Sequence, residues 1–145
     1  KTLGNAGLQM VVCLVVTFIF LNALNLMNIS SGPEPMYAKI QQLPVWGRIL
    51  IAIWAGFSEE FAYRGYAITR LQQLTGSKTA AILIPIILFG VGHAANGSLV
   101  HIVFAMLIGF VFIAFYLKTR NLVANIFAHS LYDILFLVIV PALSS

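Results

Sequence analysis

Long apolar runs separated by short polar breaks dominate this chain. The runs predict helices over residues 8–27, 46–74, 79–92, 99–117 and 122–140. The intervening breaks contain Gly, Pro, Asn or basic residues, which are typical of turns. A bilayer core accepts only helices or closed barrels, because backbone polar groups find no water there. We find no strand pattern and no internal repeat, so the sequence predicts an all-α integral membrane protein, a bundle of about five helices.

Composition and charge agree with a location in the membrane. The chain is 61% hydrophobic and only 8% charged, unlike a soluble domain. Its net charge of +4 comes from scattered basic residues near segment ends, so we expect membrane lipid as a partner and no nucleic acid. The positive-inside bias groups Lys1, Arg70, Lys78, Lys118 and Arg120 on the cytoplasmic side, opposite Lys39 and Arg48. We expect a multi-pass protein, in the plasma membrane if the source is bacterial.

The chain divides into two parts by pattern. Residues 1–45 are expected to form a first transmembrane helix and an interfacial linker, and residues 46–145 the functional core. Tyr37 and Trp46 are the expected interface anchors. Cys13 stands alone, which excludes an internal disulfide and a cysteine metal motif and favours a packing role. Because the chain begins with Lys1 instead of Met, we expect a fragment or a processed product.

Two adjacent acids, Glu59 and Glu60, follow the apolar run 49–57. The chain has only four acidic residues, the other two being Glu34 and Asp133. A carboxylate at membrane depth is costly unless it is paired, hydrated or protonated. In a helix, Glu60 and Arg64 stand four residues apart and can form an ion pair, while Glu59 points about 100° away. One acid is then neutralised and the other is available for a site; the alternative is a purely structural network.

Three histidines complete the unusual polar residues. His93 shares a helix face with Phe89, and His129 shares one with Asp133. Glu59 lies 17 residues before Gly76 and His93 lies 17 residues after it, so an antiparallel hairpin brings the two level. His129 reaches the same depth only if the break at 94–98 lies inside the protein, against the second and fifth helices. We expect an intramembrane polar site there, with His101 in a structural role.

These residues resemble the motifs of a known family. Glu-Glu-x-x-x-Arg (Glu59, Glu60, Arg64), Phe-x-x-x-His (Phe89, His93) and His-x-x-x-Asp (His129, Asp133) occur in the order found in the CAAX protease and bacteriocin-processing family, also called the Abi family of membrane proteases. The resemblance covers roughly residues 46–140. It implies an intramembrane glutamate-type endopeptidase without metal or other cofactor, whose substrates are prenylated or membrane-associated peptides or leader peptides.

The resemblance also implies a role for each matched residue. Glu59 and His93 would activate the attacking water, and His129 and Asp133 would stabilise the oxyanion. Glu60, Arg64 and Phe89 would support them. Amide hydrolysis needs such a base and such donors. The prenyl-protein endopeptidases carry Asn where this chain has Asp133, and an ionised Asp cannot donate a hydrogen bond, so it would orient and charge His129 or be protonated itself.

Other functions fit the same residues. A non-catalytic member of the fold, acting in bacteriocin self-immunity or as a membrane scaffold, would keep the motifs without cleavage. Glu59, His93 and His129 could instead supply a zinc set, although the chain has no His-Glu-x-x-His motif. A proton-coupled carrier would use the ionisable residues as a relay, but its inverted repeat is missing.

Overall fold

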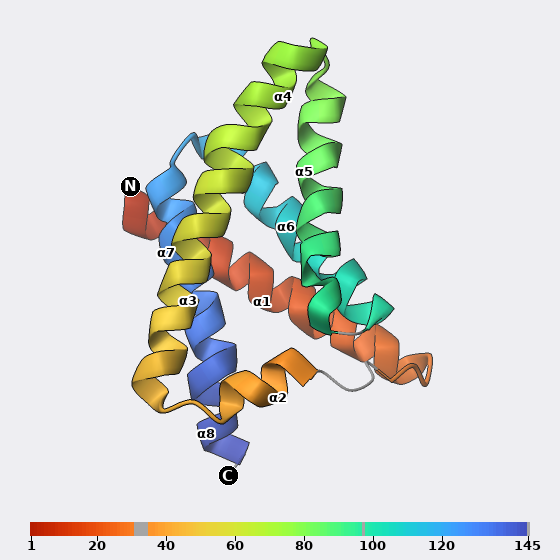
Figure 1. Ribbon diagram of the computed structural model, residues 1–145, viewed down its shortest axis with the longest axis vertical. Helices are drawn as coiled ribbons and strands as arrows, with labels where there is room; N and C mark the ends of the chain where they lie inside the picture. The colour runs from red at the N-terminus through yellow and green to blue at the C-terminus, as the bar shows by residue number, and fades with distance from the viewer. Residues whose placement is uncertain (31–34, 97, 145) are drawn as a thin grey trace.

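Helical runs that cross one another make up the computed structural model, which describes residues 1–30, 35–96 and 98–144 (Figure 1). The elements are α1 (Thr2–Leu26), α2 (Pro35–Gln41), α3 (Val45–Glu59), η1 (Glu60–Ala67), α4 (Ile68–Thr75), α5 (Lys78–Gly92), η2 (His93–Asn96), α6 (Leu99–Thr119), α7 (Leu122–Ile134), η3 (Leu135–Ile139) and α8 (Val140–Ser144). α3, η1 and α4 form one continuous run, and so do α7, η3 and α8. Glu34 and part of the predicted break before α2 lie outside the described residues.

Four helical segments among the described residues are long and apolar enough to cross a membrane. They are Thr2–Leu26, Lys78–Ala95, Leu99–Thr119 and Leu122–Leu143. The described residues contain no strand. The protein is therefore an all-α membrane protein, as the sequence predicts.

Several boundaries differ from the predicted ones. α1 begins at Thr2, six residues earlier than expected, and its first turns contain Gly4 and Gly7. The sequence predicts a helix over residues 79–92, and at 14 residues that helix is too short to cross a membrane; together with η2 the observed helical segment reaches Ala95 and is long enough. Pro85 lies inside α5 without ending it. The linker before Val45 contains the short helix α2.

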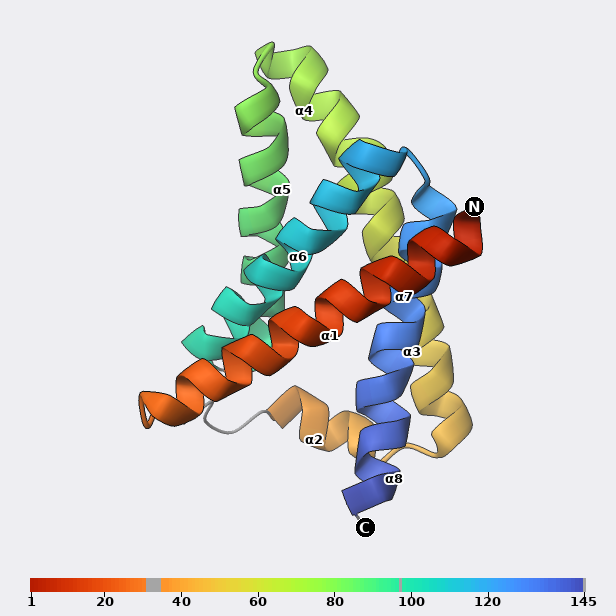
Figure 2. The same ribbon diagram turned by 180° about the vertical axis from the view of Figure 1, so that it is seen from behind.

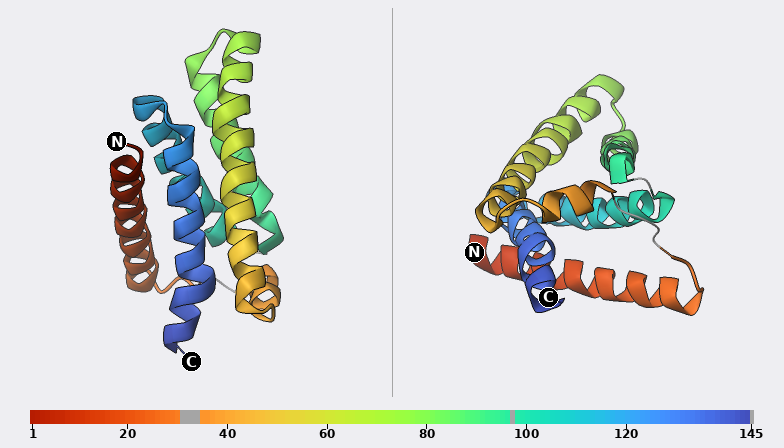
Figure 3. Two further views of the ribbon diagram at one scale, coloured as in Figure 1. Left: turned by 90° about the vertical axis from the view of Figure 1, so that its left-hand side faces the viewer. Right: turned by 60° about the horizontal axis from the view of Figure 1, so that its bottom comes forward.

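The two tight turns after α4 and α6 lie at the same end of the bundle, and α2 lies at the other (Figures 1 and 3). Gly76 ends α4 with a φ of 68°, a left-handed conformation that glycine adopts without strain. Ser77 and Asn121 then cap α5 and α7 by accepting hydrogen bonds from Ala80 N and Ala124 N. This arrangement matches the grouping of basic residues, while the side that faces the cytoplasm stays a prediction.

Of all the pairs of helices among the described residues, α3 and α7 make the most extensive contact. Gly56 lies directly against Ser130, so that a Cβ at position 56 would meet the Ser130 Oγ and, at 2.8 Å, its backbone nitrogen. α1 crosses the back of the bundle over α6 and α7 (Figure 2), where Cys13 and Phe112 belong to the main apolar cluster. The division after residue 45 stays a prediction.

Each of the two π-helical segments, η1 and η3, carries polar groups that bond to other parts of the chain. η1 carries Glu60 and Arg64, and both are wholly buried. The widened turn of η3 offers two backbone carbonyls to neighbouring side chains: Tyr37 donates to Phe136 O, and Gln41 and Arg48 donate to Leu137 O. The bonds from Tyr37 and Gln41 hold α2 across one end of the bundle, and the bond from Arg48 joins α3 to the same turn. π segments inside helices are frequent at functional sites.

Candidate active site

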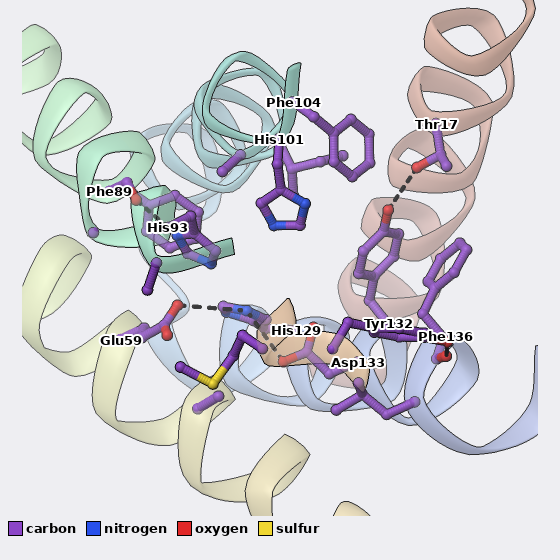
Figure 4. Close-up of a pocket in the computed structure, with 18 of the residues that line it drawn as sticks. Thr17, Glu59, Phe89, His93, His101, Phe104, His129, Tyr132, Asp133 and Phe136 are labelled. Atoms are coloured by element: carbon purple, nitrogen blue, oxygen red, sulfur yellow. Dashed lines mark hydrogen bonds and ion pairs between the residues drawn. The ribbon is translucent and has the colours of Figure 1, made fainter. Parts of the chain in front are cut away.

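Glu59, His93, His129 and Asp133 all line one cavity of about 630 Å³ (Figure 4). Glu59 ends α3, His93 follows the last residue of α5, and the other two lie one turn apart on α7. The hairpin through Gly76 therefore brings the first two residues to the same cavity, as the residue count predicts. Among the described residues, η2, which forms the start of the break, packs mainly on α2, α5 and α6, whereas the sequence predicts packing against the second and fifth long helices.

His129 stands at the centre of the acidic residues. Its Nδ1 lies 2.9 Å from Glu60 Oε1, and since a carboxylate only accepts, Nδ1–H is the donor. Its Nε2 lies 3.8 Å from Glu59 Oε2 and 3.6 Å from Asp133 Oδ2. These separations fit ion pairs and are longer than hydrogen bonds. The Nε2 edge is thus the face that His129 presents to the cavity.

The two adjacent acids take different environments, as the helical geometry predicts. Glu60 is wholly buried and accepts from Arg64 Nη1 at 2.8 Å, while the side chain of Glu59 is 29% exposed. Arg64 also donates through Nη2 to Gly109 O at 3.0 Å, and its guanidinium lies 4.7 Å from the ring centre of Phe89. The predicted Glu60–Arg64 pair is confirmed, and Phe89 packs on it.

Asn125 is a member of this network that the sequence did not reveal. It lies one turn before His129, wholly buried, and its Nδ2 donates to Glu60 Oε2 at 3.2 Å and to Phe112 O at 2.8 Å. Its four-residue spacing from His129 in an apolar helix was the available signal. The Phe112 ring stacks on His129 at 4.7 Å between centres. Together these contacts fix the imidazole in position and in orientation.

His93 presents one nitrogen to the cavity. Its Nδ1 lies 2.7 Å from Phe89 O, a carbonyl that can only accept, so Nδ1 carries the proton. In the neutral ring Nε2 is then an acceptor. His101, for which a structural role was expected, also lines the cavity and stacks with His93 at 5.9 Å between ring centres.

The remainder of the cavity is mainly apolar, and sequence reasoning did not find it. Its walls come from α1, α2, α6 and η3, with Phe20, Leu21, Leu24, Ile40, Phe104 and Phe136 among the lining residues. Thr17 donates to Cys13 O, so the Tyr132 hydroxyl donates to Thr17 Oγ1 at 2.6 Å. This bond ties the α1 wall to α7, next to Asp133.

The sequence allowed a zinc set of Glu59, His93 and His129. In the part of the chain that the structure describes, no three His, Cys, Asp or Glu side chains are placed to hold one metal ion. The placement of these side chains therefore does not support a zinc site formed by Glu59, His93 and His129. Metal independence itself stays a prediction for experiment.

A comparison with models of known protein families shows to which family this chain belongs. The family model described as Type II CAAX prenyl endopeptidase Rce1-like matches residues 41–135, about two-thirds of the chain. The chain belongs to this family. The three motifs and Asn125 lie within the matched residues, and the protein is therefore a member of the CAAX-type intramembrane protease family. The helix α1 lies outside the matched residues. Comparisons with curated proteins and with solved structures each gave no match.

Proposed function

We propose that this family member is an active, metal-independent intramembrane endopeptidase that cleaves peptides with water activated by Glu59. One observation carries the proposal. In a chain with four acidic residues, two carboxylates and three histidines line the same cavity, while a third carboxylate and its arginine lie buried behind them.

Glu59 and His93 would activate the water. The Glu59 carboxylate reaches the cavity and can take a proton, and His93 Nε2 can accept a hydrogen bond from the same water. The hydroxide adds to the scissile carbonyl carbon. Glu59 then passes its proton to the departing amine, so that the bond broken is the amide C–N bond.

His129 would stabilise the oxyanion. With a proton on each nitrogen it donates to Glu60 through Nδ1 and aims Nε2–H into the cavity. The buried Glu60–Arg64 pair holds the acceptor that fixes this orientation. Asp133 lies beside Nε2 and supplies negative charge to the imidazolium instead of a second donor.

The substrate would be a prenylated or otherwise membrane-associated peptide, or a leader peptide. The polar groups occupy one wall of the cavity and apolar side chains of α1, α6 and η3 the rest. An apolar group attached to the substrate would lie along those side chains, with its peptide bond at Glu59.

One observation favours a second candidate, a non-catalytic role in bacteriocin self-immunity or as a membrane scaffold. The Asp133 carboxylate stands 3.6 Å from His129 Nε2, close to where an oxyanion would approach, and two like charges repel. In this role the network would serve stability alone.

Cleavage by the purified protein in detergent separates the two. Wild type, Glu59→Gln and His93→Ala are given a library of prenylated and unprenylated peptides, and products are identified by mass spectrometry. The proposal expects cleavage by wild type alone, with all three proteins unfolding at similar temperatures. Absence of cleavage by wild type, or turnover near wild type in either variant, would favour the scaffold.

A further inference from the structure

A second cavity lies at the end of the bundle that carries the tight turns. It is a groove of about 290 Å³ between α4 and the turn that joins α6 to α7, and Figures 1 and 2 show α4 beside this turn. Its lining residues are Ile68, Thr69, Gln72, Gln73 and Arg120. All of them except Ile68 are polar and exposed, whereas Ile68 is 2% exposed and forms an apolar floor. None of these described residues lines the candidate active site.

Arg120 presents a cation at the depth of the lipid headgroups. α6 is one of the segments long enough to cross a membrane, and Arg120 is the residue directly after it. The guanidinium lies 5.8 Å from the ring centre of Tyr116, one turn earlier on α6. Tyr116 packs in turn on the apolar cluster that contains Ile68. The cation is therefore held beside the floor of the groove, where the hydrocarbon ends and the headgroup phosphates begin.

The α4 wall of the groove supplies hydrogen-bond donors. Arg70 Nη1 donates to Gln73 Oε1 at 3.1 Å, so the amide nitrogen of Gln73 is the group directed away from Arg70. Gln72 brings a second amide to the groove, and Thr69 brings a hydroxyl. Together with the guanidinium of Arg120, these groups can donate to several oxygens of one bound anion.

The charges at this end of the bundle favour an anion. Arg70 lies on α4 beside the groove, Lys118 lies in the last turn of α6, and Lys78 begins α5. The described carboxylates are gathered at the candidate active site, and none of them lines the groove. The groove therefore offers no described carboxylate to the cationic part of a zwitterionic headgroup. A phosphate suits Arg120, because a guanidinium can donate two parallel hydrogen bonds to it.

We propose that this groove binds the phosphate of an anionic lipid headgroup. Arg120 pairs with the phosphate, and Thr69, Gln72 and Gln73 donate to its other oxygens. A lipid is the occupant because the groove lies at the end of a membrane-spanning helix and has an apolar floor; basic pockets between such helices bind anionic headgroups. The bound lipid joins α4 to the α6–α7 turn and so stabilises this end of the bundle. The inference does not depend on the proposed function.

The test compares lipid binding by wild type, Arg120→Gln and Lys118→Gln. Both variants lose one positive charge at the same end of α6, but Lys118 does not line the groove. Each protein is titrated in an uncharged detergent with phosphatidylglycerol or with phosphatidylcholine, and bound lipid is measured by native mass spectrometry. Wild type is expected to bind phosphatidylglycerol about fivefold or more tightly than phosphatidylcholine. Arg120→Gln is expected to lose this preference, and Lys118→Gln to keep it.

A second readout distinguishes a lipid from a free phosphate compound. Phosphatidylglycerol is expected to raise the unfolding temperature of wild type and of Lys118→Gln, and to leave that of Arg120→Gln unchanged. Glycerol phosphate, which carries the phosphate without acyl chains, is expected to have no effect at the same concentration. If Arg120→Gln does not fold, Arg120→Asn replaces it, because Asn is tolerated at the φ of 50° that this position adopts.

The outcomes bear on the groove alone. Equal binding of the two lipids by wild type overturns the site. Equal loss of the preference in the two charge variants also overturns it, because general surface charge then accounts for the binding. Stabilisation by glycerol phosphate to the same extent as by phosphatidylglycerol overturns the lipid as the occupant. None of these measurements uses cleavage, so failure of this site and failure of the proposed peptidase are distinguished.

Discussion

Glu60→Ala is expected to destabilise the protein far more than a change at the cavity wall. Glu60 is wholly buried and accepts three hydrogen bonds, from Arg64, His129 and Asn125. Removing it leaves the Arg64 cation buried with Gly109 O as its remaining acceptor among the described residues. Loss of one partner of a buried ion pair costs about 3–5 kcal/mol. For a chain of this size we expect the unfolding temperature to fall by roughly 10–15 °C.

The chain supplies its own probe for this measurement. Cys13 is its one cysteine and is 1% exposed, so a thiol-reactive fluorogenic dye reports unfolding in detergent. Glu59→Gln is the matched control, because Glu59 is the neighbouring acid with a partly exposed side chain. Its unfolding temperature is expected to stay within about 3 °C of that of wild type.

A double variant tests the reason for the loss. Replacing both partners by apolar residues, Glu60→Leu with Arg64→Met, removes the uncompensated charge and is expected to recover about half or more of the lost stability. Cleavage should stay absent, since His129 loses its anchor. A stable Glu60→Ala protein, or a double variant less stable than Glu60→Ala, would refute the reasoning.

Three further predictions concern packing, the oxyanion and metal. Gly56→Ala should lower the free energy of unfolding by about 1–3 kcal/mol, because the new Cβ meets the backbone of Ser130. Gly7→Ala is the control: a Cβ at position 7 meets nothing within 4 Å, so the free energy of unfolding should stay the same or rise by about 1 kcal/mol. Equal unfolding temperatures of the two variants would contradict the α3–α7 contact. Asp133→Asn should raise kcat about two- to tenfold, since an amide donates to the oxyanion, and a tenfold fall in the same cleavage assay would show that the carboxylate is required. Cleavage should survive chelators; stoichiometric zinc whose removal abolishes activity and whose return restores it would overturn metal independence.

The local part of the site could be predicted from the sequence because helical geometry fixes it. The four-residue spacings of Glu60 with Arg64 and of His129 with Asp133 place each pair together whatever the fold. The symmetric count around Gly76 similarly brings Glu59 and His93 to one cavity.

The contacts between distant helices could not be predicted. The bonds from Asn125 to Glu60 and from Tyr132 to Thr17 depend on how α1, α3 and α7 cross, which no spacing in a single sequence encodes. The catalytic roles of Glu59, His93, His129 and Asp133 remain predictions, since geometry brings the groups together without showing that they react.

The kinetics of a double variant test the central claim most directly. If Glu59 and His93 activate the same water, removing either abolishes the step, and their effects are not additive. Single-turnover cleavage is measured for wild type, Glu59→Gln, His93→Ala and the variant with both changes. We predict that the double variant is slower than the slower single variant by no more than about threefold. Losses that multiply in the double variant, or a single variant with turnover near wild type, would contradict the account.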